Sequence, residues 1–195
     1  MLPSSFHFGI VEAGCDEAGR GCLAGPVVAA AVVLPPGFSH ELIKDSKKLS
    51  ETQRYAAREI ITVNALAWGI GVVSASEIDR INILNASILA MHRALERLSV
   101  EPAHIVVDGN RFKPWRMIPY TTVVKGDAKL GNIAAASILA KTFRDDIMTA
   151  LHESLPYYGF NEHKGYPTAK HKRSIAEYGA SPWHRFTFGG VKETL

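Results

Sequence analysis

The chain has 195 residues, which is enough for one domain with a sizeable core. Hydrophobic residues make up 47% and charged residues 21%, proportions that exclude a disordered or fibrous chain. The net charge of +3 permits a polyanionic partner without demanding one.

Several features bear on where the protein works. The first nine residues lack the basic start and apolar centre of a secretory signal. The longest apolar run, at residues 26–34, is too short to span a bilayer. Cys15 and Cys22 are the only cysteines, too few for an extracellular disulfide scaffold. We therefore expect a cytoplasmic protein with reduced thiols and no membrane association.

The first half of the chain mixes short apolar runs with helix-start signals. In order, the patterns predict a strand at 10–15 ending at Asp16, a strand at 26–34, a helix from 50 to about 61, a strand at 65–73, and helical sequence from 74 that includes 82–98. Ser50–Gln53 and Ser74–Glu77 both have the capping-box pattern that opens a helix.

Helices dominate the second half. The patterns predict strands at 104–107 and 121–124, a long helix from 131 to about 152, and a last helix at 168–178. The start of the long helix is apolar nearly all round, so we expect it to be buried. No linker or repeat is visible. The sequence predicts one α/β domain over residues 1–195, with a central mixed sheet flanked by helices and a helical C-terminal part from about 150 to 195.

Acidic residues end three of the apolar runs. Asp16 and Glu17 follow the first run, Asp108 follows the run at 104–107, and Asp127 follows the run at 121–124. Carboxylates gathered about 4 Å apart repel by roughly 4 kcal/mol per pair at an effective dielectric near 20, so such a cluster needs a cation. Each acid taken alone is readily explained as part of a solvated turn, and the three strand ends together are the stronger signal. Because neighbours on a regular strand face opposite ways, Asp16 and Glu17 are expected to share a site only if the strand ends or bulges there.

Other segments suit a nucleic-acid substrate. Gly19–Gly21 is a glycine-bracketed arginine, which lets backbone and guanidinium approach a phosphodiester, although an ordinary surface turn is the alternative. Residues 163–173 are basic and contain Tyr166, whose ring can stack on a base or sugar or simply be half-buried. Lys47 and Lys164 are candidate phosphate contacts. Ser137 and Lys141, four apart on one helix face, can bind phosphate or support the acids.

The chain resembles ribonuclease HII, the type 2 ribonuclease H family. The resemblance rests on segments that follow the family's order, namely GCDEAGRG at 14–21, DSKKL at 45–49, VDGN at 107–110, KGD at 125–127, AAASILAK at 134–141 and HKGYPT at 163–168. It implies a ribonuclease H-like fold with a C-terminal helical extension that binds substrate. It also implies an endonuclease that cuts the RNA strand of RNA–DNA hybrids and cuts 5′ of single ribonucleotides in duplex DNA, thereby removing misincorporated ribonucleotides. No pattern indicates an oligomer, so a monomer is the default expectation.

The resemblance also implies roles for particular residues. The metal-binding and catalytic carboxylates would be Asp16, Glu17, Asp108 and Asp127. Gly19, Arg20 and Gly21 would meet the 2′-hydroxyl and adjacent phosphate of the ribonucleotide, and Tyr166 would stack on the duplex. The predicted substrate-binding set also includes the residues named above from the sequence pattern, Lys47, Ser137, Lys141 and Lys164. Two divalent ions, Mg²⁺ or Mn²⁺, would serve catalysis and leave 5′-phosphate and 3′-hydroxyl ends. Two alternatives stay open, a non-catalytic nucleic-acid-binding module and a DNA-junction nuclease of the same fold.

Overall fold

A computed structural model describes residues 1–194 of the chain. Its centre is one mixed sheet with the strand order β3-β2-β1-β4-β5. The strands are β1 (Glu12–Ala18), β2 (Val27–Val33), β3 (Ala67–Val73), β4 (His104–Asp108) and β5 (Tyr120–Val123). The first three pair antiparallel, whereas β4 runs parallel to both β1 and β5.

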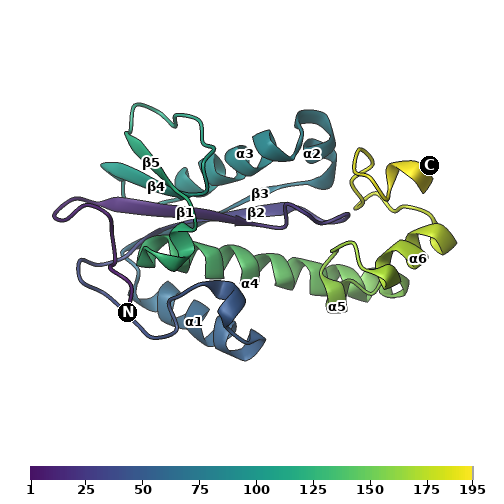
Figure 1. The fold of residues 1–195 in the computed structure, drawn as a ribbon, viewed down its shortest axis with the longest axis horizontal. Helices are drawn as coiled ribbons and strands as arrows, with labels where there is room; N and C mark the ends of the chain where they lie inside the picture. Colours follow the sequence, from purple (N-terminus) through teal and green to yellow (C-terminus); the bar gives the residue numbers. More distant parts are fainter. Residues whose placement is uncertain (195) are drawn as a thin grey trace.

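Helices cover both faces of the sheet (Figure 1). They are α1 (Glu51–Asn64), α2 (Ala75–Ile81), α3 (Ile83–Leu95), α4 (Gly131–Ser154), α5 (Phe160–His163) and α6 (Ala169–Tyr178). In the figure, α2 and α3 lie on one face, and α1 and α4 lie on the other. Short 3₁₀ turns occupy Ser46–Lys48, Gly126–Ala128, Pro156–Tyr158 and Lys192–Thr194. None of the helices in residues 1–194 combines the length and the apolar character needed to cross a membrane.

The core lies on both sides of β2, in which every residue is buried. Val27, Ala29 and Ala31 face one apolar cluster with residues of α3, while the residues between them face a second cluster with α4. On β3, a side chain at Gly71 would meet the Ala90 carbonyl at 1.9 Å, so α3 packs directly on the strand backbone. These two layers fix the sheet, and with it the ends of β1 and β4.

The C-terminal helix α5 lies beside the last turns of α4, and α6 lies beyond the end of α4 (Figure 1). Met148 and Leu151 of α4 pack on Tyr158 and Phe160, and Ala24, from the loop after β1, joins the same cluster. The helical C-terminal part is therefore attached both to α4 and to the loop that follows Ala18.

The predicted fold class, α/β with a mixed sheet flanked by helices, is confirmed. The predicted end of the first strand at Asp16 is wrong, because β1 continues to Ala18. Its antiparallel ladder with β2 persists past the acids, from Asp16 opposite Ala30 to Ala18 opposite Val28, and keeps these residues extended despite their polarity. The predicted helix at 82–98 ends earlier, at Leu95.

Candidate active site

Asp16 and Glu17 follow the last residue of β1 that pairs with β4. The parallel pairing of these strands ends at Cys15 opposite Val107, so both acids stand beside an open edge. Because β1 is regular, their side chains leave on opposite faces of the sheet. The Asp16 carboxylate bonds the Ser137 hydroxyl of α4. The expected strand end or bulge is absent, and the open edge brings the two acids to one site instead.

Glu17 occupies the other face, where it borders a small hollow with Ser87 and Ile88 of α3. Asp108, the last residue of β4, also borders this hollow. The negative charge of Asp108 raises the pKa of both Asp16 and Glu17. Asp108 thus links the two acids across the end of the sheet.

Asp127 reaches the same end of the sheet from the turn before α4. Asp108 Oδ1 accepts a hydrogen bond of 2.7 Å from the Gly126 amide, which ties this turn to β4. Lys125 begins the turn in a left-handed conformation, with φ of 56°. Four carboxylates from three separate segments therefore gather at this end of the sheet.

The gathered carboxylates repel one another. Burial raises the pKa of Asp16 well above its usual range, and the charges of Glu17 and Asp108 raise it further. Burial also raises the pKa of Glu17 and of Asp127. Arg20 opposes the shift of Glu17 through a 3.0 Å ion pair. Crowded oxygen donors whose charged forms are disfavoured without a cation fit Mg²⁺ or Mn²⁺, which prefer oxygen ligands.

A cavity of about 310 Å³, here called the acidic cavity, adjoins these carboxylates. Its lining includes Asp16, Glu17, Gly19, Arg20, Gly21, Ser46, Lys47, Arg54, Asp108, Ser137, Lys141 and Tyr166. Asp127 lies next to this lining, since its Oδ2 is 3.9 Å from the Nζ of Lys47. Lys141 is held by Asp145 on its own helix, at 2.6 Å. The cavity thus combines acids with cations and glycines.

One predicted substrate contact lies elsewhere. The Lys164 ammonium donates to Thr149 Oγ1 and to the carbonyl of Asn161, at 3.0 and 2.7 Å, and the residue does not line the acidic cavity. What Lys164 gives the site is its backbone, since its carbonyl accepts a hydrogen bond from Arg144.

Two buried arginines, Arg144 and Arg185, support the loop after β1, a role that the sequence did not indicate for either. Arg185 donates to the carbonyls of Gly19, Arg20 and Gly25, and Arg144 donates to carbonyls of the same loop at Ala24 and Pro26. Burial lowers the pKa of Arg185 to about 10. No local pattern marks Arg185 in the sequence, because its partners are backbone carbonyls some 160 residues earlier.

The two glycines beside Arg20 differ in their surroundings. Gly19 has φ of +96°, and a β-carbon there would lie 2.0 Å from Arg144 Nε. Packing alone therefore requires glycine at 19. A β-carbon at Gly21 would meet nothing within 4 Å, although the residue lines the acidic cavity. The protein itself leaves the space beside Gly21 open.

Tyr166 lines the acidic cavity from a loop held by histidines. Its carbonyl accepts from His171 Nδ1 at 2.9 Å, and His171 Nε2 contacts His184 Nε2 at 3.1 Å. His184 Nδ1 accepts from the Ser181 amide. Since a carbonyl only accepts and an amide only donates, the proton between the rings belongs to His184, and both rings are neutral. Burial lowers the pKa of both histidines to about 4.

Ser46 and Arg54 also line the cavity without having been predicted as site residues. The Ser46 hydroxyl lies 3.1 Å from that of Ser137. Arg54 donates to the Leu49 carbonyl at 2.7 Å. Ser46 lies within the DSKKL segment, so a signal existed for it, whereas Arg54 is one of several charged residues on α1 and has no distinguishing pattern.

Comparison with known proteins gives one consistent match. The family model described as Ribonuclease HII matches residues 13–191. The ribonuclease HII of Bacteroides thetaiotaomicron is 64% identical over 188 residues, which cover 96% of this chain and 94% of that protein. The crystal structure of the ribonuclease H2 from Pyrococcus horikoshii has a TM-score of 0.78 at 26% identity and covers 94% of this chain and 96% of that one. The RNase HII of Archaeoglobus fulgidus, solved in complex with PCNA, has a TM-score of 0.75 at 27% identity, with coverage of 92% and 96%.

The mixed sheet, its flanking helices and these structural neighbours define a ribonuclease H-like protein with a helical C-terminal part. Within that class the chain belongs to the ribonuclease HII family. The predicted resemblance is confirmed, and with it the prediction of an enzyme, since this is a family of divalent-metal-dependent hydrolases with ribonuclease H activity. The alternative of a non-catalytic binding module is wrong.

Proposed function

We propose that the protein cleaves the RNA strand of RNA–DNA hybrids and cuts 5′ of single ribonucleotides in duplex DNA, with the acidic cavity as its active site. The observation that carries the proposal is that Gly19–Gly21 lies in the same cavity as Asp16, Glu17 and Asp108. A phosphate-binding and sugar-sensing loop thus stands beside the acids. Cleavage at this site would leave a 5′-phosphate and a 3′-hydroxyl.

We further propose that Asp16, Glu17, Asp108 and Asp127 hold two divalent ions, Mg²⁺ or Mn²⁺. Ions held there would activate a water and stabilise the leaving 3′-oxygen. The role of the carboxylates is to bind the ions and to hold them in position. The mutual repulsion of these acids supports the assignment, because a divalent cation removes it.

Selection of RNA requires contact with the 2′-hydroxyl, since this group distinguishes the two sugars. The open space at Gly21 lets a sugar edge approach the loop backbone, which a β-carbon would obstruct. Arg144 and Arg185 hold the loop through hydrogen bonds to its carbonyls, so the backbone groups of the loop are in place before substrate binds. A site built to hydrogen-bond a hydroxyl discriminates strongly against the sugar that lacks it.

The remaining residues bind and orient the duplex. Tyr166, 42% exposed at the cavity, presents its ring for stacking on a sugar or base. Lys47, Lys141 and Ser137 offer phosphate contacts from two sides. Lys164 acts through its carbonyl on Arg144. The helical extension from about residue 150 adds binding surface, and we expect a cytoplasmic monomer.

The test is cleavage of duplexes of one sequence carrying either no ribonucleotide, one, or an RNA tract, with and without Mn²⁺ or Mg²⁺. We expect metal-dependent cutting 5′ of the lone ribonucleotide and none of the all-DNA duplex. Cutting of the all-DNA duplex at comparable rates would favour the junction-nuclease alternative. Asp108→Asn should abolish cleavage with the fold intact, and undiminished cutting by this variant would exclude the site.

A further inference from the structure

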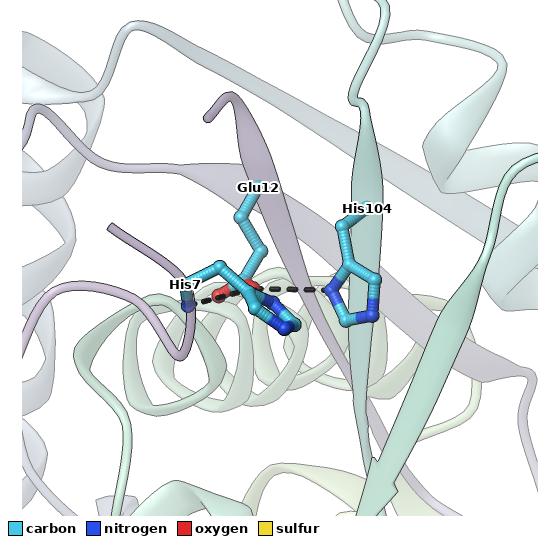
Figure 2. A group of neighbouring side chains, drawn as sticks. All are labelled: His7, Glu12 and His104. Atoms are coloured by element: carbon cyan, nitrogen blue, oxygen red, sulfur yellow. Dashed lines mark hydrogen bonds and ion pairs between the residues drawn. The ribbon is translucent and has the colours of Figure 1, made fainter. Parts of the chain in front are cut away.

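A second group of ligand-type side chains meets at the start of β1, away from the acidic cavity. Glu12 Oε2 lies 2.9 Å from His7 Nδ1 and 3.1 Å from His104 Nδ1 (Figure 2). The three ligand atoms all lie within 4.8 Å of one another. Glu12 precedes Asp16 by four residues on the same strand, which corresponds to about 13 Å.

The Glu12 carboxylate lies at the centre of this group. Its side chain is fully buried. Within residues 1–194 its ion-pair partners are the two histidines. Its other hydrogen bonds come from neutral donors, the amides of Phe6 and His7 and the side chain of Asn132. Buried carboxylates commonly pair with a cation or coordinate a metal ion, so the space between Glu12 and the two imidazoles is suited to bind one.

The arrangement of the histidines suits a metal ion. His104 Nε2 contacts the Thr121 hydroxyl at 3.1 Å, which leaves Nδ1 directed at Glu12. Metal-binding histidines characteristically donate their second ring N–H to such an oxygen, which fixes the ligand nitrogen. The side chain of His7 is 44% exposed, so an ion can enter from solvent and a water can complete four ligands.

We propose that His7, Glu12 and His104 form a Zn²⁺ site that is separate from the acidic cavity. Two imidazole nitrogens and one carboxylate oxygen suit Zn²⁺, whereas Mg²⁺ favours oxygen alone. The site does not depend on the proposed cleavage activity.

Zinc at this position fastens the N-terminal strap, defined as residues 3–8. The strap caps α4, because the carbonyls of Pro3 and Ser4 accept from the amides of Gly131 and Asn132 at 2.7 and 3.1 Å. These amides belong to the first turn of the helix and have no partner within it. The ion therefore stabilises the start of α4, close to the turn that carries Asp127.

The test titrates the full chain with Co²⁺ as a visible probe for Zn²⁺, in excess Mg²⁺ to occupy oxygen-only sites. We expect one equivalent to give the strong absorption of four-coordinate cobalt, and Zn²⁺ to remove it. His7→Gln, at a half-exposed position that keeps the protein folded, should weaken binding by about 10–100-fold or more. Zn²⁺ should raise the Tm of the wild-type protein and leave that of His7→Gln unchanged.

Two further variants separate the candidate sites. His40→Gln removes an imidazole outside the group and should bind cobalt as the wild type does. Asp108→Asn, which alters the acidic cavity, should keep the absorption band. The proposal is overturned if the wild type gives no four-coordinate band, if His7→Gln binds as tightly as the wild type, or if the band disappears in Asp108→Asn. If the wild type gives no four-coordinate band, His7, Glu12 and His104 only hold the N-terminal strap by hydrogen bonds.

Discussion

Gly19 and Arg144 are packed so closely that a β-carbon at position 19 would lie 2.0 Å from Arg144 Nε. Gly21, two residues on, faces open space in the acidic cavity. The fold thus requires the first glycine, whereas no contact within residues 1–194 requires the second. Within one loop, Gly19 therefore serves the structure and Gly21 serves the proposed function.

Alanine substitutions at the two glycines should therefore fail differently. Gly19→Ala combines a left-handed backbone with a clash and should lower the free energy of unfolding by about 2 kcal/mol or more. Gly21→Ala should change stability by less than about 0.5 kcal/mol. It should nevertheless slow cleavage at a lone ribonucleotide at least tenfold, about 1.4 kcal/mol. Urea denaturation and single-turnover cleavage measure the two effects. Full activity of a stable Gly21→Ala would refute the role of the open space.

Asp16→Asn should make the metal-free protein more stable. The pKa of Asp16 is raised by burial and by neighbouring acids, so its charge opposes folding at neutral pH when no cation is bound. We expect a higher free energy of unfolding for Asp16→Asn than for the wild type in EDTA, measured by urea denaturation. Stabilisation by Mn²⁺ and cleavage should both be lost. Glu153→Gln, an exposed acid on the same α4 helix that Asp16 faces, is the control and should match the wild type. A destabilised metal-free Asp16→Asn would contradict the account.

The sequence predicted the acids and the mixed-sheet class, because apolar runs and the residues that end them are local signals. It did not predict how Asp16 and Glu17 share a site. That depends on the pairing of β1 with β4, which ends at Cys15 opposite Val107, whereas the pairing of β1 with β2 continues to Ala18. Arg185 was equally invisible, since its role comes from carbonyls contributed by a distant loop. Lys164 lies in a basic segment, which suggested a phosphate contact. Its ammonium instead donates hydrogen bonds to Thr149 and Asn161, contacts that the sequence does not reveal.

The histidine pair behind Tyr166 should make stability depend on pH. Burial lowers the pKa of His171 and His184 from 6.5 to about 4, so between these values the unfolded chain binds more protons. Their contribution is complete above pH 6.5 and is lost as the pH falls to about 4. For one imidazole this amounts to about 3 kcal/mol. His184→Asn should flatten the wild-type profile measured by urea denaturation from pH 4 to 8. Parallel profiles for the two proteins would show that the pair does not titrate as described.

Lys47 and Lys164 should contribute differently to duplex binding. The Lys47 side chain is 85% exposed and lines the acidic cavity, whereas the Lys164 ammonium is bonded to Thr149 and Asn161. Lys47→Ala should therefore reduce the slope of log Kd against log salt by about 1, as expected for one lost phosphate contact. Lys164→Ala should leave the slope unchanged. Fluorescence anisotropy in Ca²⁺, across a salt series, measures both, and a reversed order would contradict this placement.

The most direct test of the central claim is anomalous diffraction from crystals grown with Mn²⁺. Carboxylates from β1, the end of β4 and the turn before α4 should bind manganese together at the acidic cavity. We predict anomalous peaks ligated by oxygens of Asp16, Asp108 and at least one of Glu17 and Asp127, and no such peaks in Asp108→Asn. Manganese bound elsewhere in the wild-type protein, with these four side chains free of metal, would contradict the account.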